Sequence, residues 1–158
     1  MNDLSDVVAV PPPSYASGLW RNALGGNMTE QARDVDRIAR QHAAAWTNGK
    51  ADGIAEMFAE NGSISVNGGE AKVGHVDIIE HAKELLATFP GLVVHCHETR
   101  HSGDRAVFIW TLEGRHAETG NFVTLPGWHE WELDENMKVE RCRGFFDASS
   151  LERQITGK

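Results

Sequence analysis

Two histidines lie in patterns that could bring them together in an apolar interior. His129 stands between two tryptophans in PGWHEWELDE, residues 126–135. Alternate residues of a strand share a face, so His129 goes with Trp131 and Leu133. His42 belongs to an apolar stripe at helical spacing that also contains Trp46. A buried imidazole stays neutral near pH 7 and can donate a hydrogen bond or accept a proton. We therefore expect His129 and His42 to face one pocket as catalytic groups, although two purely structural histidines would give the same pattern.

Five large apolar side chains are candidates for the lining of that pocket. Such residues dominate small-molecule sites, but they also fill ordinary cores. The alternation of residues 107–110 leaves open which face of its strand Trp110 occupies. The candidates for ligand contact are Trp46, Phe58, Leu86, Trp110 and Trp131.

Three further histidines, His95, His97 and His101, could form a metal cluster. His95 and His97 alternate with Val94 and Cys96, however, which places them on the opposite, outer face of their strand. We therefore expect solvent or a dimer contact there, and no metal.

Composition excludes several classes of protein. The chain has 158 residues, 41% of them hydrophobic and 24% charged, which is typical of a globular domain. The net charge of −8 and the absence of a basic cluster argue against a nucleic-acid partner. No apolar run is long enough to cross a membrane, and the N-terminus lacks the pattern of a secretion signal. We expect a cytoplasmic protein in which Cys96 and Cys142 are free thiols.

The order of elements predicts an α+β fold. Residues 1–28, with three prolines at 11–13, are expected to form an extended arm ahead of one domain at 29–158. Helices are expected at about 29–48, 52–58 and 76–88, with a strand at 63–66 between the last two. Four longer strands follow as an antiparallel meander, and Asp147 is expected to cap a final short helix. Helices followed by a run of strands indicate a curved sheet around helices, with a pocket between them.

Several segments resemble the SnoaL-like branch of the nuclear transport factor 2-like superfamily. They are AAAWTNGKADGIAEMFAENGSISV, GHVDIIEHAKELLATFP, LEGRHAETG and MKVERCRGFFDASSLERQ, and the resemblance covers roughly residues 33–154. It implies a cone-shaped fold in which a curved sheet wraps three helices around a pocket, usually in a homodimer formed through the sheet. Relatives of this kind include polyketide cyclases, ketosteroid isomerase, epoxide hydrolases and dehydratases.

The resemblance also implies roles for individual positions. His42 falls where the isomerases carry an oxyanion-stabilising tyrosine, and His129 falls where the cyclases have a histidine. The isomerase base position falls at Val66 and the cyclase aspartate position at Gly144, and neither residue can take a proton. His116 matches a recurrent feature of the family, which implies either a contact at the pocket mouth or a hydrogen bond within a turn.

Three functions are compatible with these residues. The first is a cofactor-independent enzyme of the cyclase or isomerase type, which acts on a small apolar carbonyl or polyketide-like compound through His129 and His42. The second is a non-catalytic protein that binds a small apolar molecule, favoured by the missing base. The third is a dimeric interaction module that uses the outer face of the sheet.

Overall fold

The computed structural model describes residues 29–158, and the expected arm at 1–28 lies outside them. Its helices are α2 (Glu30–Thr47), α3 (Ala51–Glu56), α4 (His75–Thr88) and α5 (Ala148–Thr156). Each lies within two residues of its expected position. The apolar stripe of α2 is buried along its whole length, from Val35 to Trp46. Burial of one helical face, rather than intrinsic helix propensity, thus holds α2 in place.

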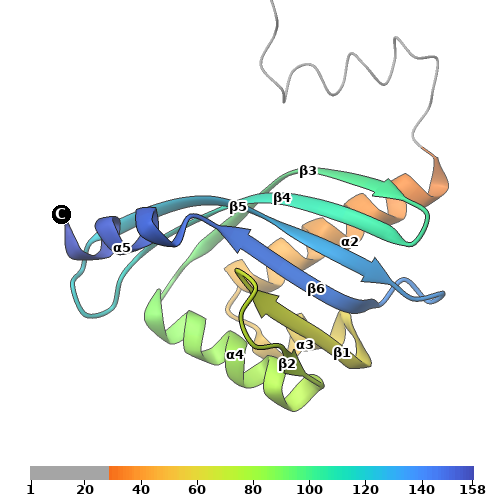
Figure 1. The fold of residues 1–158 in the computed structure, drawn as a ribbon, viewed down its shortest axis with the longest axis horizontal. Helices are drawn as coiled ribbons and strands as arrows, with labels where there is room; N and C mark the ends of the chain where they lie inside the picture. The colour runs from red at the N-terminus through yellow and green to blue at the C-terminus, as the bar shows by residue number, and fades with distance from the viewer. Residues whose placement is uncertain (1–28) are drawn as a thin grey trace, which may run out of the picture. The chain divides into compact units, whose positions relative to one another are not determined.

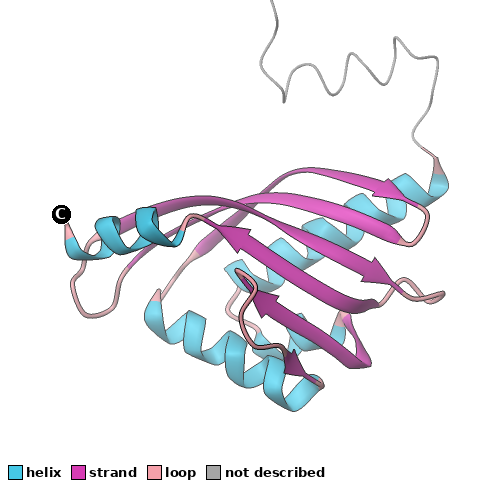
Figure 2. Cartoon of the chain, in the orientation of Figure 1, coloured by secondary structure: helices cyan, strands magenta, loops and turns pink. Residues whose placement is uncertain are grey.

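In the described part of the chain, six strands form one mixed sheet that curves over α2, α3 and α4 (Figures 1 and 2). The strand order is β2-β1-β6-β5-β4-β3, with β1 parallel to β6 and every other pair antiparallel. This arrangement confirms the expected α+β class. The strands are β1 (Phe58–Val66), β2 (Lys72–Val73), β3 (Val93–Ser102), β4 (Arg105–Arg115), β5 (Phe122–Leu133) and β6 (Val139–Phe146).

The strand β1 begins earlier than its sequence suggests. Phe58, expected at the end of a helix, already pairs with Val139 of β6, so that expectation was wrong. The segment around Gly62, expected to be a turn, is an irregularity within the strand, because the register shifts between Phe58 and Ser63. A β-carbon at Gly62 would lie 2.7 Å from the carbonyl oxygen of Val139. Glycine here therefore permits close approach of two backbones, not a chain reversal.

Alternation on β4 and β5 defines the two faces of the sheet. Trp131 and Leu133 are buried, whereas Trp128 is 42% exposed, as expected from the period of two. Trp110, whose face the sequence left open, is buried on the inner side and lies opposite Gly127. The aromatic side chains that surround His129 thus lie on the inner face of the sheet.

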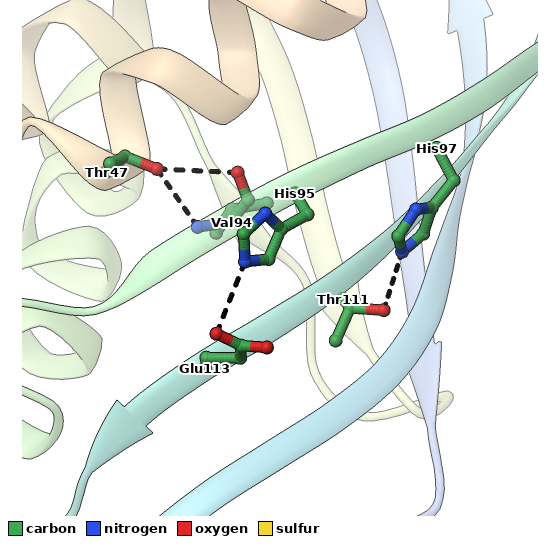
Figure 3. Close-up of polar contacts among 6 residues, drawn as sticks. All are labelled: Thr47, Val94, His95, His97, Thr111 and Glu113. Carbon is green, nitrogen blue, oxygen red and sulfur yellow. Dashed lines mark hydrogen bonds and ion pairs between the residues drawn. The ribbon is translucent and has the colours of Figure 1, made fainter.

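The edge strand β3 changes its faces part-way along. Its pairing with β4 slips between Cys96 and Glu98, which is a bulge. His95 precedes the bulge and His97 lies within it, and their side chains point outward to Glu113 (3.3 Å) and Thr111 (2.7 Å) of β4 (Figure 3). This confirms the outer position expected for both histidines.

His101 lies beyond the bulge, opposite the buried Ala106, so it does not share a face with His95 and His97. Within residues 29–158, no group of three or more histidine, cysteine or acidic side chains could hold a metal ion.

Side-chain hydrogen bonds connect α2 and α5 to the sheet. At the end of α2, the Thr47 hydroxyl accepts from the N–H of Val94 at 2.9 Å and donates to its carbonyl oxygen at 3.4 Å (Figure 3). Gln154 of α5 binds both backbone groups of Thr124 on β5. Asp147 accepts from the N–H of Ser150, which confirms it as the cap of α5.

The two cysteines are free thiols with little reactivity. Cys142 is fully buried and Cys96 is half-buried. Burial raises the pKa of Cys142 to about 12 and that of Cys96 to about 11, so both thiols are protonated at neutral pH. No described helix is both long and apolar enough to cross a membrane.

Candidate functional site

A cavity of about 80 Å³ lies between the inner face of the sheet and the helices. Its wall is built mainly from apolar side chains of β1, β3, β4, β5, β6 and α4, and Leu151 of α5 completes it. Among residues 29–158, no aspartate, glutamate, lysine or arginine lines this cavity. The lining residues with a polar nitrogen are Trp46, His81, Trp110 and His129.

His129 projects from β5 into this cavity, as its strand position predicts. Its imidazole lies over Gly144 of β6, the residue directly opposite in the sheet. A β-carbon on Gly144 would lie 3.1 Å from Nε2 and 3.0 Å from Cδ2 of His129. Nε2 therefore lies along the Gly144 wall of the cavity. The Nδ1 atom is enclosed and has no hydrogen-bond partner among the described residues.

The environment of His129 keeps its imidazole neutral. Burial is the main cause of a pKa well below the usual 6.5, and the nearby His42 and His81 lower that pKa further. Part of the side-chain surface remains open, because the ring forms cavity wall. A neutral imidazole in such a place offers one N–H donor and one lone-pair acceptor.

His42 lies one layer behind His129 and is not among the cavity-lining residues. It is 0% exposed, and its ring centre is 5.5 Å from that of His129 at an interplanar angle of 71°. The indole Nε1–H of Trp46 donates to His42 Nε2 at 3.1 Å. Burial lowers the pKa of His42 to about 4, so the ring is neutral at pH 7.

His81 reaches the cavity from α4 and was not predicted from the sequence. Burial lowers its pKa, against an opposing effect of Glu84. A usable signal existed, because His81 follows the buried Ile78 by three residues and precedes the cavity-lining Leu85 by four. The structure therefore brings two neutral imidazoles, His81 and His129, to one apolar cavity.

The predicted ligand contacts fall into two groups. Trp46 and Trp110 line the cavity. Phe58 and Trp131 do not; both are fully buried in the surrounding core, in ring contact with His42. Leu86 lies in a separate surface depression that Lys83 also lines. Contact of any of these residues with a ligand stays a prediction.

His116 takes part in a turn and does not line the cavity. Its Nδ1 accepts from the N–H of Thr119 at 3.3 Å, and its ring packs edge-on against Phe89 at 5.8 Å. Of the two alternatives for His116, the structure shows the hydrogen bond within the turn.

Two positions that the resemblance marks as base positions, Val66 and Gly144, both line the cavity. Two carboxylates elsewhere in the chain, those of Asp147 and Glu98, do not replace them. Asp147 is occupied as a helix cap, and Glu98 pairs with Arg100 on β3 at 3.3 Å. Among the described residues that line the cavity, the side chains able to accept a proton are the imidazoles of His81 and His129.

A family profile described as the SnoaL-like domain matches residues 39–141, which is more than half of the chain and includes His42, His81 and His129. The chain belongs to the SnoaL-like domain family. No curated protein matches the sequence.

Solved structures agree with the SnoaL-like fold. A ketosteroid isomerase-like protein of Catenulispora acidiphila, in complex with trimethylamine, is 18% identical over 75% of this chain and 92% of its own, with a TM-score of 0.70. A SnoaL-like polyketide cyclase, so described, of Jannaschia is 19% identical over 78% and 94%, with a TM-score of 0.66. An isomerase, so described, of Bacillus subtilis is 16% identical over 84% and 97%, with a TM-score of 0.69. At these identities the likeness shows the fold alone.

Proposed function

We propose that this SnoaL-like protein is a cofactor-independent enzyme of the isomerase or cyclase type that acts on a small, neutral carbonyl compound. The observation that carries the proposal is the pair of neutral imidazoles, His129 and His81, in a cavity that is otherwise apolar and lacks a carboxylate. An apolar wall selects uncharged compounds, because an ion would lose its hydration without gaining a partner. The names of the cyclase and isomerase among the structural neighbours support the same class of reaction.

The two histidines have complementary roles in this proposal. His129 donates a hydrogen bond to the carbonyl oxygen, and His81 accepts a proton from the neighbouring carbon. The electron pair of that C–H bond moves onto the oxygen as an enolate, which the N–H of His129 stabilises. The protonated His81 then returns the proton, to the same carbon in a saturated ketone or to the far end of the dienolate in an unsaturated ketone whose double bond shifts. A neutral imidazole can polarise a carbonyl in this way without itself being charged.

The size of the cavity limits the compound. About 80 Å³ open to water-sized groups holds roughly five to eight of them. A single ring with a carbonyl group fits this space, whereas a multi-ring polyketide requires the cavity to widen. We therefore propose monocyclic ketones as the substrate class.

Deuterium exchange tests the proposed chemistry directly. Cyclohexanone and cyclohexenones, incubated with the protein in D₂O, should gain deuterium beside the carbonyl, followed by NMR. Replacing His129→Phe or His81→Phe should reduce the protein-dependent rate by about 10² or more, the usual contribution of a positioned acid or base. His97→Phe, on the outer face, is the matched control and should leave the rate unchanged. Unchanged exchange in His129→Phe would remove this residue from the mechanism.

The absence of a carboxylate from the cavity favours a second candidate, a binding protein without catalysis. Trp46 and Trp110 line the cavity, so a bound ketone should change the tryptophan fluorescence. Saturable fluorescence change without any protein-dependent deuterium exchange would select this alternative.

We also infer that the protein forms a homodimer through the outer face of its sheet. Trp128 is 42% exposed there and stacks on Phe145, with ring centres 5.3 Å apart. An exposed tryptophan stacked on a half-buried aromatic ring is typical of the centre of an interface. Trp128→Glu should convert the dimer to a monomer, measured by light scattering after size exclusion.

Val76→Glu is the control for that substitution. Val76 is 72% exposed but belongs to α4, away from the outer sheet face, so its replacement should leave the dimer intact. A monomeric wild-type protein, or a Trp128→Glu protein that still dimerises, would contradict the inference.

A further inference from the structure

Three rings connect α2 with the cavity. Trp46 donates its Nε1–H to Nε2 of His42 at 3.1 Å. His42 in turn meets His129 edge-to-face, with 5.5 Å between ring centres. Trp46 and His129 both line the cavity, whereas His42 is completely enclosed between them. The hydrogen bond that fixes the proton of His42 therefore lies next to His129, the ring that would face a ligand.

Trp46 determines which nitrogen of His42 carries the proton. An indole nitrogen can only donate, so Nε2 of His42 must be the acceptor. A neutral ring with a lone pair on Nε2 carries its hydrogen on Nδ1. His42 is neutral at pH 7, since its pKa is about 4. Its Nδ1–H is a buried donor with no partner among the described residues.

The rings in contact with His129 that carry a polar atom present donors to it. Its ring contacts are His42, Phe108, Trp110 and Trp131, at 5.5 to 6.4 Å between centres. Of these, the two indoles can only donate, and His42 presents Nδ1–H. A proton on the enclosed Nδ1 of His129 would add another buried donor, and no acceptor among the described residues lies within hydrogen-bond distance of this atom. A lone pair on Nδ1 is therefore the favoured arrangement, and it leaves the proton on Nε2.

We propose that Trp46 and His42 are positioning residues that hold His129 in the tautomer with a lone pair on Nδ1 and a hydrogen on Nε2. Because Nε2 lies at the Gly144 wall of the cavity, the site presents a hydrogen-bond donor to its ligand. The ligand must then carry an acceptor oxygen, such as a carbonyl or ether. The use of this donor in catalysis rests on the proposed function, but the tautomer itself does not.

Nitrogen-15 NMR of the ligand-free protein at pH 7 tests the proposal. Long-range proton–nitrogen spectra distinguish a protonated ring nitrogen from an unprotonated one by its chemical shift. In the wild type, the proposal requires Nδ1–H on His42 and Nε2–H on His129. In Trp46→Phe the two nitrogen shifts of His42 should move towards each other, since neither tautomer is then fixed, and those of His129 should follow.

Trp131→Phe is the matched control. Its ring centre also lies 5.5 Å from His42, but its indole makes no hydrogen bond to that residue, so the tautomer of His42 should not change. A wild-type His129 with its proton on Nδ1 would overturn the proposal, as would equal shifts in the two variants. Should Trp46→Phe fail to fold, the wild-type spectrum still shows which nitrogen of His42 and of His129 carries the proton. Deuterium exchange can fail while the tautomer stands, so the two proposals are tested separately.

Discussion

Between pH 6.5 and pH 4, the free energy of unfolding is expected to fall by about 3 kcal/mol from His42 alone. The pKa of His42 is about 4 in the folded protein and 6.5 without burial, and this difference corresponds to about 3 kcal/mol. The unfolded chain takes up the proton first as the pH falls. The stabilisation is therefore complete above pH 6.5, is lost on acidification and changes no further below pH 4. His129 acts in the same direction, because burial also lowers its pKa.

Urea unfolding at several pH values between 7.5 and 4.5 measures this loss. His42→Gln should weaken the dependence on pH, because the amide does not titrate and its oxygen can still accept from Trp46. His97→Gln, on the exposed outer face, should keep the wild-type dependence. Identical pH profiles for the wild type and His42→Gln would show that His42 is not the acid-sensitive group.

Gly127→Ala is expected to destabilise the protein by about 1–3 kcal/mol and to alter the cavity. A β-carbon at this position would lie 2.4 Å from Cη2 of Trp110 and 2.6 Å from the carbonyl oxygen of Phe145. The oxygen belongs to the backbone of the neighbouring strand, so the indole has to move or the sheet has to distort. Since Trp110 lines the cavity, ketone affinity should fall together with stability.

Urea unfolding and tryptophan fluorescence titration with cyclohexanone measure both effects. Gly53→Ala is the control, because its β-carbon would meet nothing closer than 3.5 Å and α3 favours alanine over glycine by about 0.5–1 kcal/mol. Gly53→Ala should therefore be neutral or stabilising. Wild-type stability in Gly127→Ala would refute the close packing of Trp110 against β5.

Much of the fold was predictable, because the apolar residues of each long helix or strand recur with one clear period. The buried stripe of α2 and the alternation of β5 were enough to place His42 and His129 inside. The predictions failed where the apolar pattern was too short or was interrupted. Phe58 belongs to β1 because it pairs with Val139, a contact 81 residues away that no local pattern contains.

The site was harder to predict, because a cavity depends on which inward side chains leave space. Leu85 and Leu86 are both apolar residues of α4, but only Leu85 lines the cavity. Trp131 points inward as expected and is covered by other rings, so it belongs to the core. His81 adds a second imidazole to the cavity. Its helical spacing from Ile78 and Leu85 was the sequence signal that could have predicted its inward position.

The close fit of His129 over Gly144 also has a consequence for substitutions at position 144. Any side chain at position 144 would bring its β-carbon to within 3.0–3.1 Å of the imidazole, so the ring would have to give way. The resemblance places the aspartate of the cyclases at this position. An aspartate at position 144 would therefore require the His129 ring to shift by a few tenths of an ångström. The place of the imidazole in the cavity and the residue at position 144 are thus coupled through one contact between neighbouring strands.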